Sequence, residues 1–152
     1  MSQIKIRPGL LYDSKLISDF QCKMALETEG LKLDPVIVEK GVDAVFDDPS
    51  KGKYWVAEMG NEVVGCLLTI PEWSDWRNGT VLWIHSVYVV PQYRKFGVFT
   101  SLYKHLEHMV NQSSELRGLR LYVDKRNNSA QRVYERLGMT SEHYELYEWL
   151  KN

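Results

Sequence analysis

A short basic turn that leads from an apolar strand into an amphipathic helix carries the clearest chemical signal in the sequence. The turn contains Arg94–Gly97, and the helical pattern begins at about Val98. The first backbone N–H groups of a helix lack partners within it, and the helix dipole places positive charge there. Gly97 lets the backbone approach a ligand closely, and Arg94 and Lys95 add cationic side chains. The turn therefore predicts a site for a phosphate or pyrophosphate group.

This turn alone is a weak signal, because a basic turn before a helix is more often a solvated helix start. The sequence lacks the GxxxxGK[ST] spacing of a Walker loop and the GxGxxG spacing of a dinucleotide-binding turn. A regulator that binds nucleotide phosphates is therefore disfavoured.

A second motif follows after one more strand. Asn127, Ala130 and Tyr134 precede Gly138-Met139 with the spacing N-x-x-A-x-x-x-Y-x-x-x-G-[FM]. The two segments, in this order, resemble the GNAT family of acetyltransferases, whose first motif is [Q/R]-x-x-G-x-[G/A]. The basic turn matches that motif at its first and fourth positions and departs from it at Phe99, where the family usually has glycine or alanine. The resemblance covers residues 81–150.

The resemblance implies acetyl-CoA as the cosubstrate and an N-acetyltransferase that moves its acetyl group to a primary amine by direct attack in a ternary complex. An acyl-CoA sensor without turnover is the alternative. In the family the pantetheine arm pairs with the fourth strand, the turn holds the pyrophosphate, and the downstream asparagine contacts the arm. The implied cosubstrate-binding residues are Val87, Tyr88, Val89, Arg94, Lys95, Phe96, Gly97, Val98, Phe99, Thr100, Asn127, Ala130, Tyr134 and Arg136. Phe99 can turn into the core along an apolar helix stripe.

Two residues are candidates for proton transfer. The attacking amine must lose a proton, and the thiolate that leaves benefits from receiving one. The family tyrosine that Tyr134 matches lies near the CoA sulfur, so Tyr134 is the candidate donor, or else an amphipathic core tyrosine. His85 is the candidate base because imidazole titrates near neutrality. Its alternative, a hydrogen-bonded structural histidine, is slightly favoured, and some relatives use no dedicated base.

The acceptor is less well defined. Two carboxylates and two tryptophans lie between the third and fourth expected strands, where they could hold a cationic amine by charge and cation–π contact. Two further carboxylates near the end of the first expected helix could line the same opening of the acceptor site. These candidate substrate-binding residues are Glu72, Trp73, Asp75, Trp76, Glu27 and Glu29. A small-molecule amine and a protein amine both remain open.

The elements that must position these residues follow from periodicity and caps. Asp34-Pro35 is typical of a helix start, and Gly60-Asn61 of a tight hairpin. The strands flanking the third expected helix should pair in parallel through a right-handed crossover. Strands are expected at about residues 4–7, 54–58, 63–68, 80–90, 119–123 and 144–150, and helices at about 14–30, 34–47, 98–110 and 128–137. This order predicts an α/β (α+β) protein, and the resemblance implies a mixed sheet of about six or seven strands, splayed between strands 4 and 5, with helices on both faces.

Composition sets the broad class. The 152 residues fit a single domain, 1–152, and 44% hydrophobic with 26% charged residues is ordinary for a soluble protein. A net charge of −1 argues against a nucleic-acid partner, and no apolar run is long enough to cross a membrane. Cys22 and Cys66 lack metal-ligand spacing, as do the histidines, so no metal is expected. Two isolated cysteines also fit a reducing compartment, so a cytoplasmic location is expected. Many relatives in the family dimerise, which leaves a homodimer open.

Overall fold

The computed structural model describes residues 3–152. The chain divides into a larger compact unit that ends at Tyr122 and a smaller one, Val123–Asn152.

The larger unit is built on a five-stranded mixed sheet in the order β1-β2-β3-β4-β5. β1 to β4 pair antiparallel as neighbours, and β5 joins β4 in parallel after the helix that separates them. The parallel pairing that the sequence predicts for these two strands is therefore confirmed. The strands are β1 (Ile4–Pro8), β2 (Lys53–Met59), β3 (Glu62–Ser74), β4 (Gly79–Val89) and β5 (Leu116–Leu121).

Local sequence signals account for the helix boundaries in this unit. Asp34 caps α2 by accepting the backbone N–H of Val36 at 2.9 Å, with proline at the first helical position. Gly30 ends α1 in the left-handed region at φ 65°. The helices are α1 (Ser14–Glu29), α2 (Pro35–Asp47) and α3 (Val98–Gln112), with short 3₁₀ turns η1 (Leu11–Asp13) and η2 (Pro91–Tyr93).

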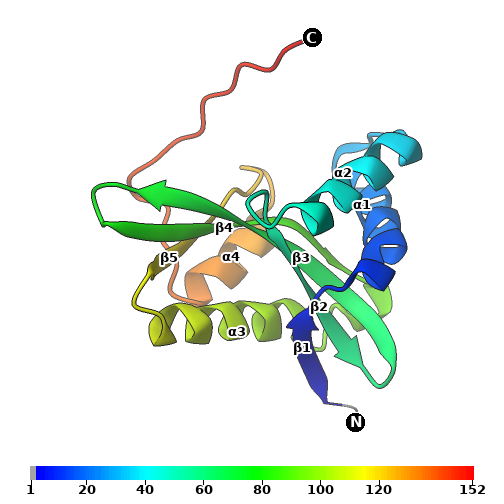
Figure 1. Cartoon of the computed structure of the whole chain (residues 1–152), viewed down its shortest axis with the longest axis horizontal. Coiled ribbons are helices and arrows are strands. Elements are labelled where there is room, and N and C mark those ends of the chain that lie inside the picture. The colour runs from blue at the N-terminus through cyan, green and yellow to red at the C-terminus, as the bar shows by residue number, and fades with distance from the viewer. Residues whose placement is uncertain (1–2) are drawn as a thin grey trace. The chain divides into compact units, whose positions relative to one another are not determined.

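Helices cover both faces of this sheet, as expected, with α1 and α2 on one side and α3 on the other (Figure 1). Tyr54 and Val56 of β2 belong to the buried cluster that includes residues of α1 and α2. Trp55, between them, points to the opposite face, where its ring lies 5.0 Å from that of His105 of α3. Successive side chains of a strand alternate between faces, so β2 is apolar throughout its centre because both faces are buried.

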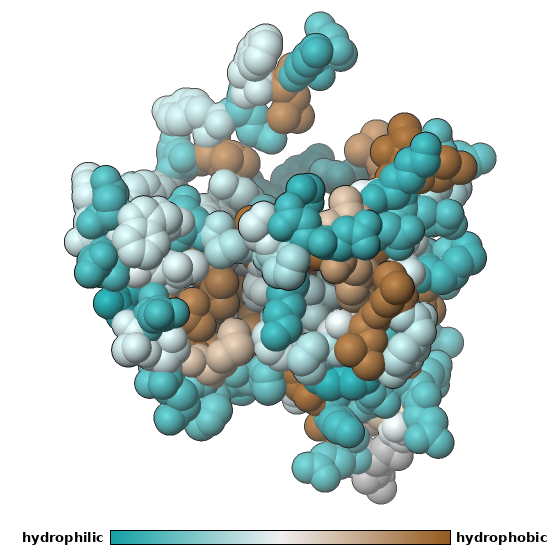
Figure 2. Space-filling model, in the orientation of Figure 1, coloured by the Kyte–Doolittle hydropathy of each residue, from teal (hydrophilic) through white to brown (hydrophobic). Residues whose placement is uncertain are grey.

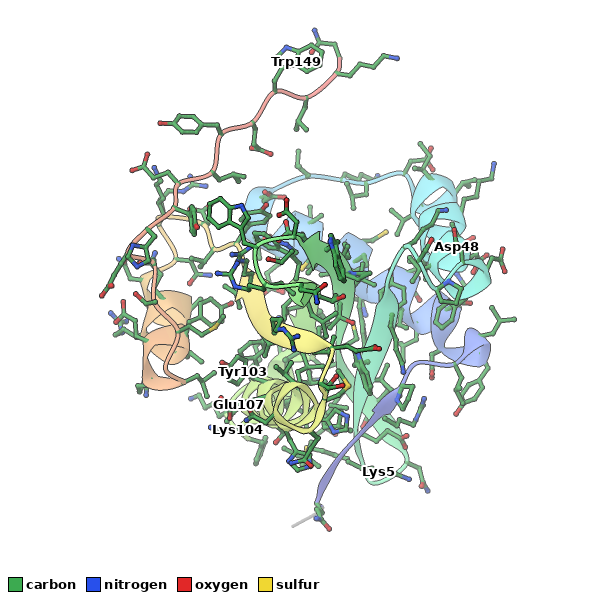
Figure 3. The ribbon with its side chains drawn as sticks, turned by 60° about the vertical axis from the view of Figure 1, so that its left-hand side comes forward. Lys5, Asp48, Tyr103, Lys104, Glu107 and Trp149 are labelled. Carbon is green, nitrogen blue, oxygen red and sulfur yellow. The ribbon has the colours of Figure 1, made fainter. Side chains whose placement is uncertain are left out.

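The first turn of α3 rests directly on the sheet at Gly65 of β3. A Cβ at Gly65 would lie 2.9 Å from Cγ1 of Val98 and 3.1 Å from the carbonyl oxygen of Tyr88. Val98 is buried, as are Leu102, Tyr103 and Leu106 along the same side of the helix. The opposite side is exposed, where Lys104 and Glu107 form an ion pair at 3.3 Å (Figure 3). The missing side chain at Gly65 thus sets how closely the start of α3 approaches β3 and β4.

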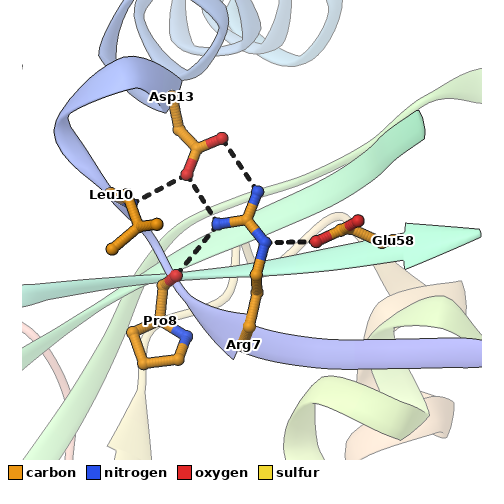
Figure 4. A network of polar contacts seen from close by, with 5 residues as sticks. All are labelled: Arg7, Pro8, Leu10, Asp13 and Glu58. Carbon is orange, nitrogen blue, oxygen red and sulfur yellow. Dashed lines mark hydrogen bonds and ion pairs between the residues drawn. The ribbon is translucent and has the colours of Figure 1, made fainter. Parts of the chain in front are cut away.

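A buried ion pair joins β1 to the start of α1 (Figure 4). The guanidinium of Arg7 contacts both carboxylate oxygens of Asp13, at 2.7 and 3.0 Å, and also pairs with Glu58 of β2. Asp13 further accepts the backbone N–H of Leu10 at 2.8 Å. Burial raises the pKa of Asp13, but the bonds from Arg7 and Leu10 outweigh it and hold that pKa below its usual value.

β5 is shorter than β4. It ends at Leu121, which pairs with Ile84, whereas β4 continues to Val89 and stays paired with β3. The expected splay between strands 4 and 5 stays a prediction, because β5 has no residue beyond this point. The register of β3 and β4 shifts between Cys66 and Leu68, and Ser86 of β4 has a φ of 56°. A β-bulge therefore lies in β4 just past the end of its pairing with β5.

The smaller unit contains one helix, α4 (Asn128–Arg136). Asn127 caps it by accepting the backbone N–H of Ala130 at 3.1 Å, and Gly138 follows it with a φ of 93°. Both boundaries agree with the sequence. The expected strand at residues 144–150 is wrong: this segment has no regular structure, and Trp149 within it is 87% exposed.

The sheet described in residues 3–152 therefore has five strands, and the expected six or seven is not met. Residues 144–150 are rich in aromatic residues, which favour strands, but a strand also needs a neighbour that pairs with its backbone. Within the described residues, no helix is both long and apolar enough to cross a membrane. Apolar side chains that remain exposed include several around α1 and α2 (Figure 2), namely Leu26, Leu31, Val36 and Ile37.

Candidate active site

The basic turn forms the link between β4 and α3. Gly97 is the N-terminal cap of α3 and adopts the left-handed region at φ 77°, which favours glycine. The first backbone bond of the helix runs from the N–H of Ser101 to the carbonyl of Gly97 at 3.0 Å. The N–H groups of residues 98–100 precede that bond, so they are the groups that a helix start offers to an anion. The local geometry therefore suits a phosphate.

Arg94 is fixed by protein groups on two sides. Its Nε donates to the carbonyl of Val89 at 2.8 Å, and its terminal nitrogens pair with the carboxylate of Glu27 at the end of α1, one of them at 2.9 Å. The guanidinium also lies 5.5 Å from the ring centre of Tyr88. The bond from Arg94 lowers the pKa of Glu27, which stays ionised. Arg94 therefore ties α1 to the end of β4, and the exposed Lys95 is the cation whose charge projects from the turn.

The aromatic residues of the turn have separate environments. Phe96 is 48% exposed, with its ring 6.2 Å from that of Tyr93. Phe99, the departure from the family motif, is half-buried, and its ring lies 6.4 Å from that of the buried Tyr103. Phe99 has thus turned toward the buried side of α3, as its helical position predicts. Thr100 is exposed on the same first turn.

His85 lies on β4 immediately before the bulge. It is half-buried, and burial lowers its pKa below the ordinary 6.5, because desolvation disfavours the charged imidazolium. Its ring is 6.3 Å from that of Trp83 and 5.9 Å from that of Tyr122. A neutral imidazole at physiological pH can accept a proton, so the environment suits a base.

The bulge beside His85 is held by a residue that the sequence did not indicate. Gln21 of α1 is buried, and its Nε2 donates to the carbonyl of Ser86 at 3.3 Å and to the sulfur of Cys66 at 3.7 Å. Burial raises the pKa of the Cys66 thiol to about 12, so this cysteine is inert. No local motif marks a glutamine for this contact, because its partner lies 65 residues away.

The carboxylates expected to hold a cationic amine do not gather in one place, and two of them pair with arginines. Glu27 pairs with Arg94, while Glu72 pairs with Arg120 of β5 at 2.8 Å. Glu29 is exposed at the last position of α1. On the β3–β4 hairpin, Trp73 is 65% and Trp76 is 87% exposed, and Asp75 is exposed beside them.

In the smaller unit the predicted residues lie on or beside α4. Tyr134 is half-buried, and burial raises its pKa, so its hydroxyl keeps its proton at neutral pH and can donate it. Asn127 uses its side-chain oxygen as the helix cap, a role that the sequence interpretation did not include. Ala130 is half-buried, and Arg136 is exposed with its Nε donating to the carbonyl of Arg132 at 3.2 Å.

Among residues 3–152 no group of three or more His, Cys, Asp or Glu side chains could hold a metal ion.

Comparison with known proteins gives the class of this chain. The model of the acetyltransferase (GNAT) family matches residues 22–139, and the chain therefore belongs to the GNAT acetyltransferase family. The crystal structure of a possible acetyltransferase from Clostridium difficile 630 is 40% identical, with a TM-score of 0.91 over 98% of each chain. No curated protein matched.

Two more distant structures share the fold. One is a predicted acetyltransferase with acetyl-CoA from Clostridium acetobutylicum, 18% identical with a TM-score of 0.72, covering 99% of this chain and 96% of that one. The other is an aminoglycoside N-acetyltransferase in complex with CoA, 12% identical with a TM-score of 0.79, covering 100% of this chain and 97% of that one.

Proposed function

We propose that this protein transfers the acetyl group of acetyl-CoA to a primary amine by direct attack. The amine nitrogen bonds to the thioester carbonyl carbon, and the carbon–sulfur bond then breaks. The amine loses one proton to a base, and the CoA thiolate takes up one proton to leave as the thiol. No acyl-enzyme is required, and the buried, fully protonated Cys66 is unsuited to form one.

The observation that carries the proposal is the course of β4. The strand extends past the end of β5, which lies opposite Ile84, and its residues Val87–Val89 lead directly toward the turn before α3. An extended pantetheine arm can pair with such a strand by backbone hydrogen bonds. The pyrophosphate then meets the N–H groups at the start of α3, with Lys95 beside them. Membership of the GNAT family supports the same assignment.

Two side chains are proposed for the proton transfers. His85 takes the proton of the amine, directly or through a water, because its half-buried imidazole is neutral at physiological pH. Tyr134 gives a proton to the sulfur, because burial keeps its hydroxyl protonated. Tyr134→Phe should lower kcat more than it weakens acetyl-CoA binding, and an unchanged kcat would remove Tyr134 from the chemistry.

The direct test is release of CoA thiol from acetyl-CoA against a panel of primary amines and peptides. Turnover with at least one acceptor supports the enzyme. Tight acetyl-CoA binding with no turnover on any acceptor would replace it with an acyl-CoA sensor.

The cosubstrate site is tested by two matched lysine variants. Lys95→Ala should weaken CoA binding by about ten-fold or more, the value of one charge-assisted hydrogen bond. Lys104→Ala removes an exposed lysine of α3 that lies beyond its first turn and should leave CoA binding unchanged. Equal CoA dissociation constants for both variants and wild type, measured by titration calorimetry, would contradict the assigned site.

A further inference from the structure

Three aromatic rings form a continuous cluster at the end of β5, beside the middle of β4. Trp83 and His85 lie two residues apart on β4 and so share a face of the sheet. Tyr122 follows the last residue of β5, and its ring is 4.6 Å from that of Trp83 and 5.9 Å from that of His85. These separations are those of stacked and edge-to-face aromatic pairs. We call the cluster of Trp83, His85 and Tyr122 the ring wall.

The ring wall is partly open and lies on the sheet face that α1 and α2 cover elsewhere. In the β3–β4 register His85 pairs with Leu68, and Leu68 belongs to the buried cluster under those helices. Trp83 and His85 are half-buried, while Tyr122 is 50% exposed. The apolar face therefore continues into a surface that a small molecule can contact.

The charges beside the ring wall are already balanced. Arg120, which pairs with Trp83 in the β4–β5 register, lies with its guanidinium carbon 5.8 Å from the centre of the Trp83 ring. Its charge is met by Glu72 at 2.8 Å. A second ammonium group on the acceptor would have to break this pair to reach a carboxylate. The surface thus favours an uncharged, flat group over a polyamine chain.

We infer that the ring wall of Trp83, His85 and Tyr122 is the acceptor subsite and that it takes an amine carrying an aromatic ring. This inference rests on the proposed function, because it assigns the substrate class of the same site. The acceptor ring packs against Trp83 and Tyr122, which places its amine at the His85 end of the wall. His85 then both contacts the acceptor and receives its proton.

The test compares four amines: 2-phenylethylamine, 2-cyclohexylethylamine, hexylamine and 1,4-diaminobutane. We expect kcat/KM to be highest for 2-phenylethylamine, ahead of its saturated ring analogue by about two- to twelve-fold, the value of one aromatic contact beyond area burial. Trp83→Leu and Tyr122→Leu should each remove that preference, because they should lower kcat/KM for 2-phenylethylamine more than for 2-cyclohexylethylamine or hexylamine. Trp149→Leu, which replaces an exposed tryptophan in the C-terminal segment, is the matched control and should change none of these values.

A preference for 1,4-diaminobutane or hexylamine, or equal losses for all four amines in the Tyr122→Leu variant, would overturn the inference. Tyr122 is half-exposed, so its variant keeps the test valid if Trp83→Leu does not fold. Binding of 2-phenylethylamine is measured by calorimetry in parallel, on the CoA-loaded protein. Ring-selective binding without turnover would reject the proposed enzyme and keep the subsite, whereas turnover without ring preference would do the reverse.

Discussion

Replacing Gln21 by leucine should loosen β4, the strand that carries both the proposed base His85 and the backbone groups proposed to pair with the pantetheine arm. Leucine keeps much of the buried volume and removes the amide that donates to the carbonyl of Ser86 at 3.3 Å. The remaining donor near that carbonyl is the thiol of Cys66 at 3.9 Å, a weak one. The bulge would then depend on a poorly satisfied buried acceptor.

The size of the effect follows from the lost bond, because a buried acceptor left without its partner costs about 1–3 kcal/mol. The left-handed backbone of Ser86, with φ 56°, costs a non-glycine residue roughly 1–2 kcal/mol in wild type and variant alike, so it does not add to this difference. For a chain of this size a loss of about 2 kcal/mol lowers Tm by roughly 4–8 °C. A shifted bulge that costs one backbone bond to CoA weakens binding by about five-fold.

The assay is thermal unfolding together with CoA titration, on four proteins. Gln112→Leu, at the exposed end of α3, is the matched control and should behave as wild type. Ser86→Gly in the Gln21→Leu background should recover part of the lost Tm, because glycine adopts a positive φ without a Cβ penalty. The reasoning fails if Gln21→Leu has the Tm and the CoA affinity of wild type, or if Ser86→Gly lowers Tm further.

Three shorter predictions concern other positions. In pH–rate profiles the acidic limb of kcat/KM should lie below pH 6.5, since burial lowers the pKa of His85, and a limb unchanged in His85→Ala would assign the base elsewhere. Gly97→Ala should cost about 1–2 kcal/mol by denaturant unfolding, through backbone strain at φ 77° alone, because no atom lies within 4 Å of the added Cβ. Asp13→Ala should cost about 2 kcal/mol by removing the carboxylate bonds of the partly buried Arg7, which keeps Glu58 as its partner. Because the folded pKa of Asp13 is depressed, its contribution to stability is present above the usual value of 3.8 and is lost as pH falls through the folded pKa; wild type should therefore lose this advantage over Asp13→Ala at low pH.

Local signals predicted most of the elements from the sequence. The caps at Asp34 and Gly30 depend on residues within one turn of the helix end, so single-sequence reasoning locates them. The parallel pairing of β4 and β5 also followed from sequence, since a helix lies between them. The exception, residues 144–150, shows that a composition rich in aromatic residues favours a strand and leaves open whether a partner strand exists.

Sequence reasoning predicted the parts of the candidate site that are continuous in sequence and missed the contacts between distant segments. The turn at Gly97 and the capped helix after Asn127 are continuous motifs, and both have the expected local form. Contacts between distant segments carried no sequence signal: Arg94 meets Glu27 across 67 residues, and Arg120 meets Glu72 across 48. These pairings changed the chemistry expected of each group, because carboxylates assigned to an amine are neutralised by arginines.

The absent side chain at Gly65 gives the turn before α3 unusual freedom for redesign. The height of the helix start above the sheet is set from beneath, by Val98 resting on β3, and the groups offered to an anion are backbone N–H groups. Side chains at Lys95, Phe96 or Phe99 can therefore be exchanged to tune which acyl carrier enters, while the scaffold keeps its form. A methyl group at residue 65 would instead push on Val98 and on the Tyr88 carbonyl together, so one carbon atom in the interior would disturb more than several changes on the surface.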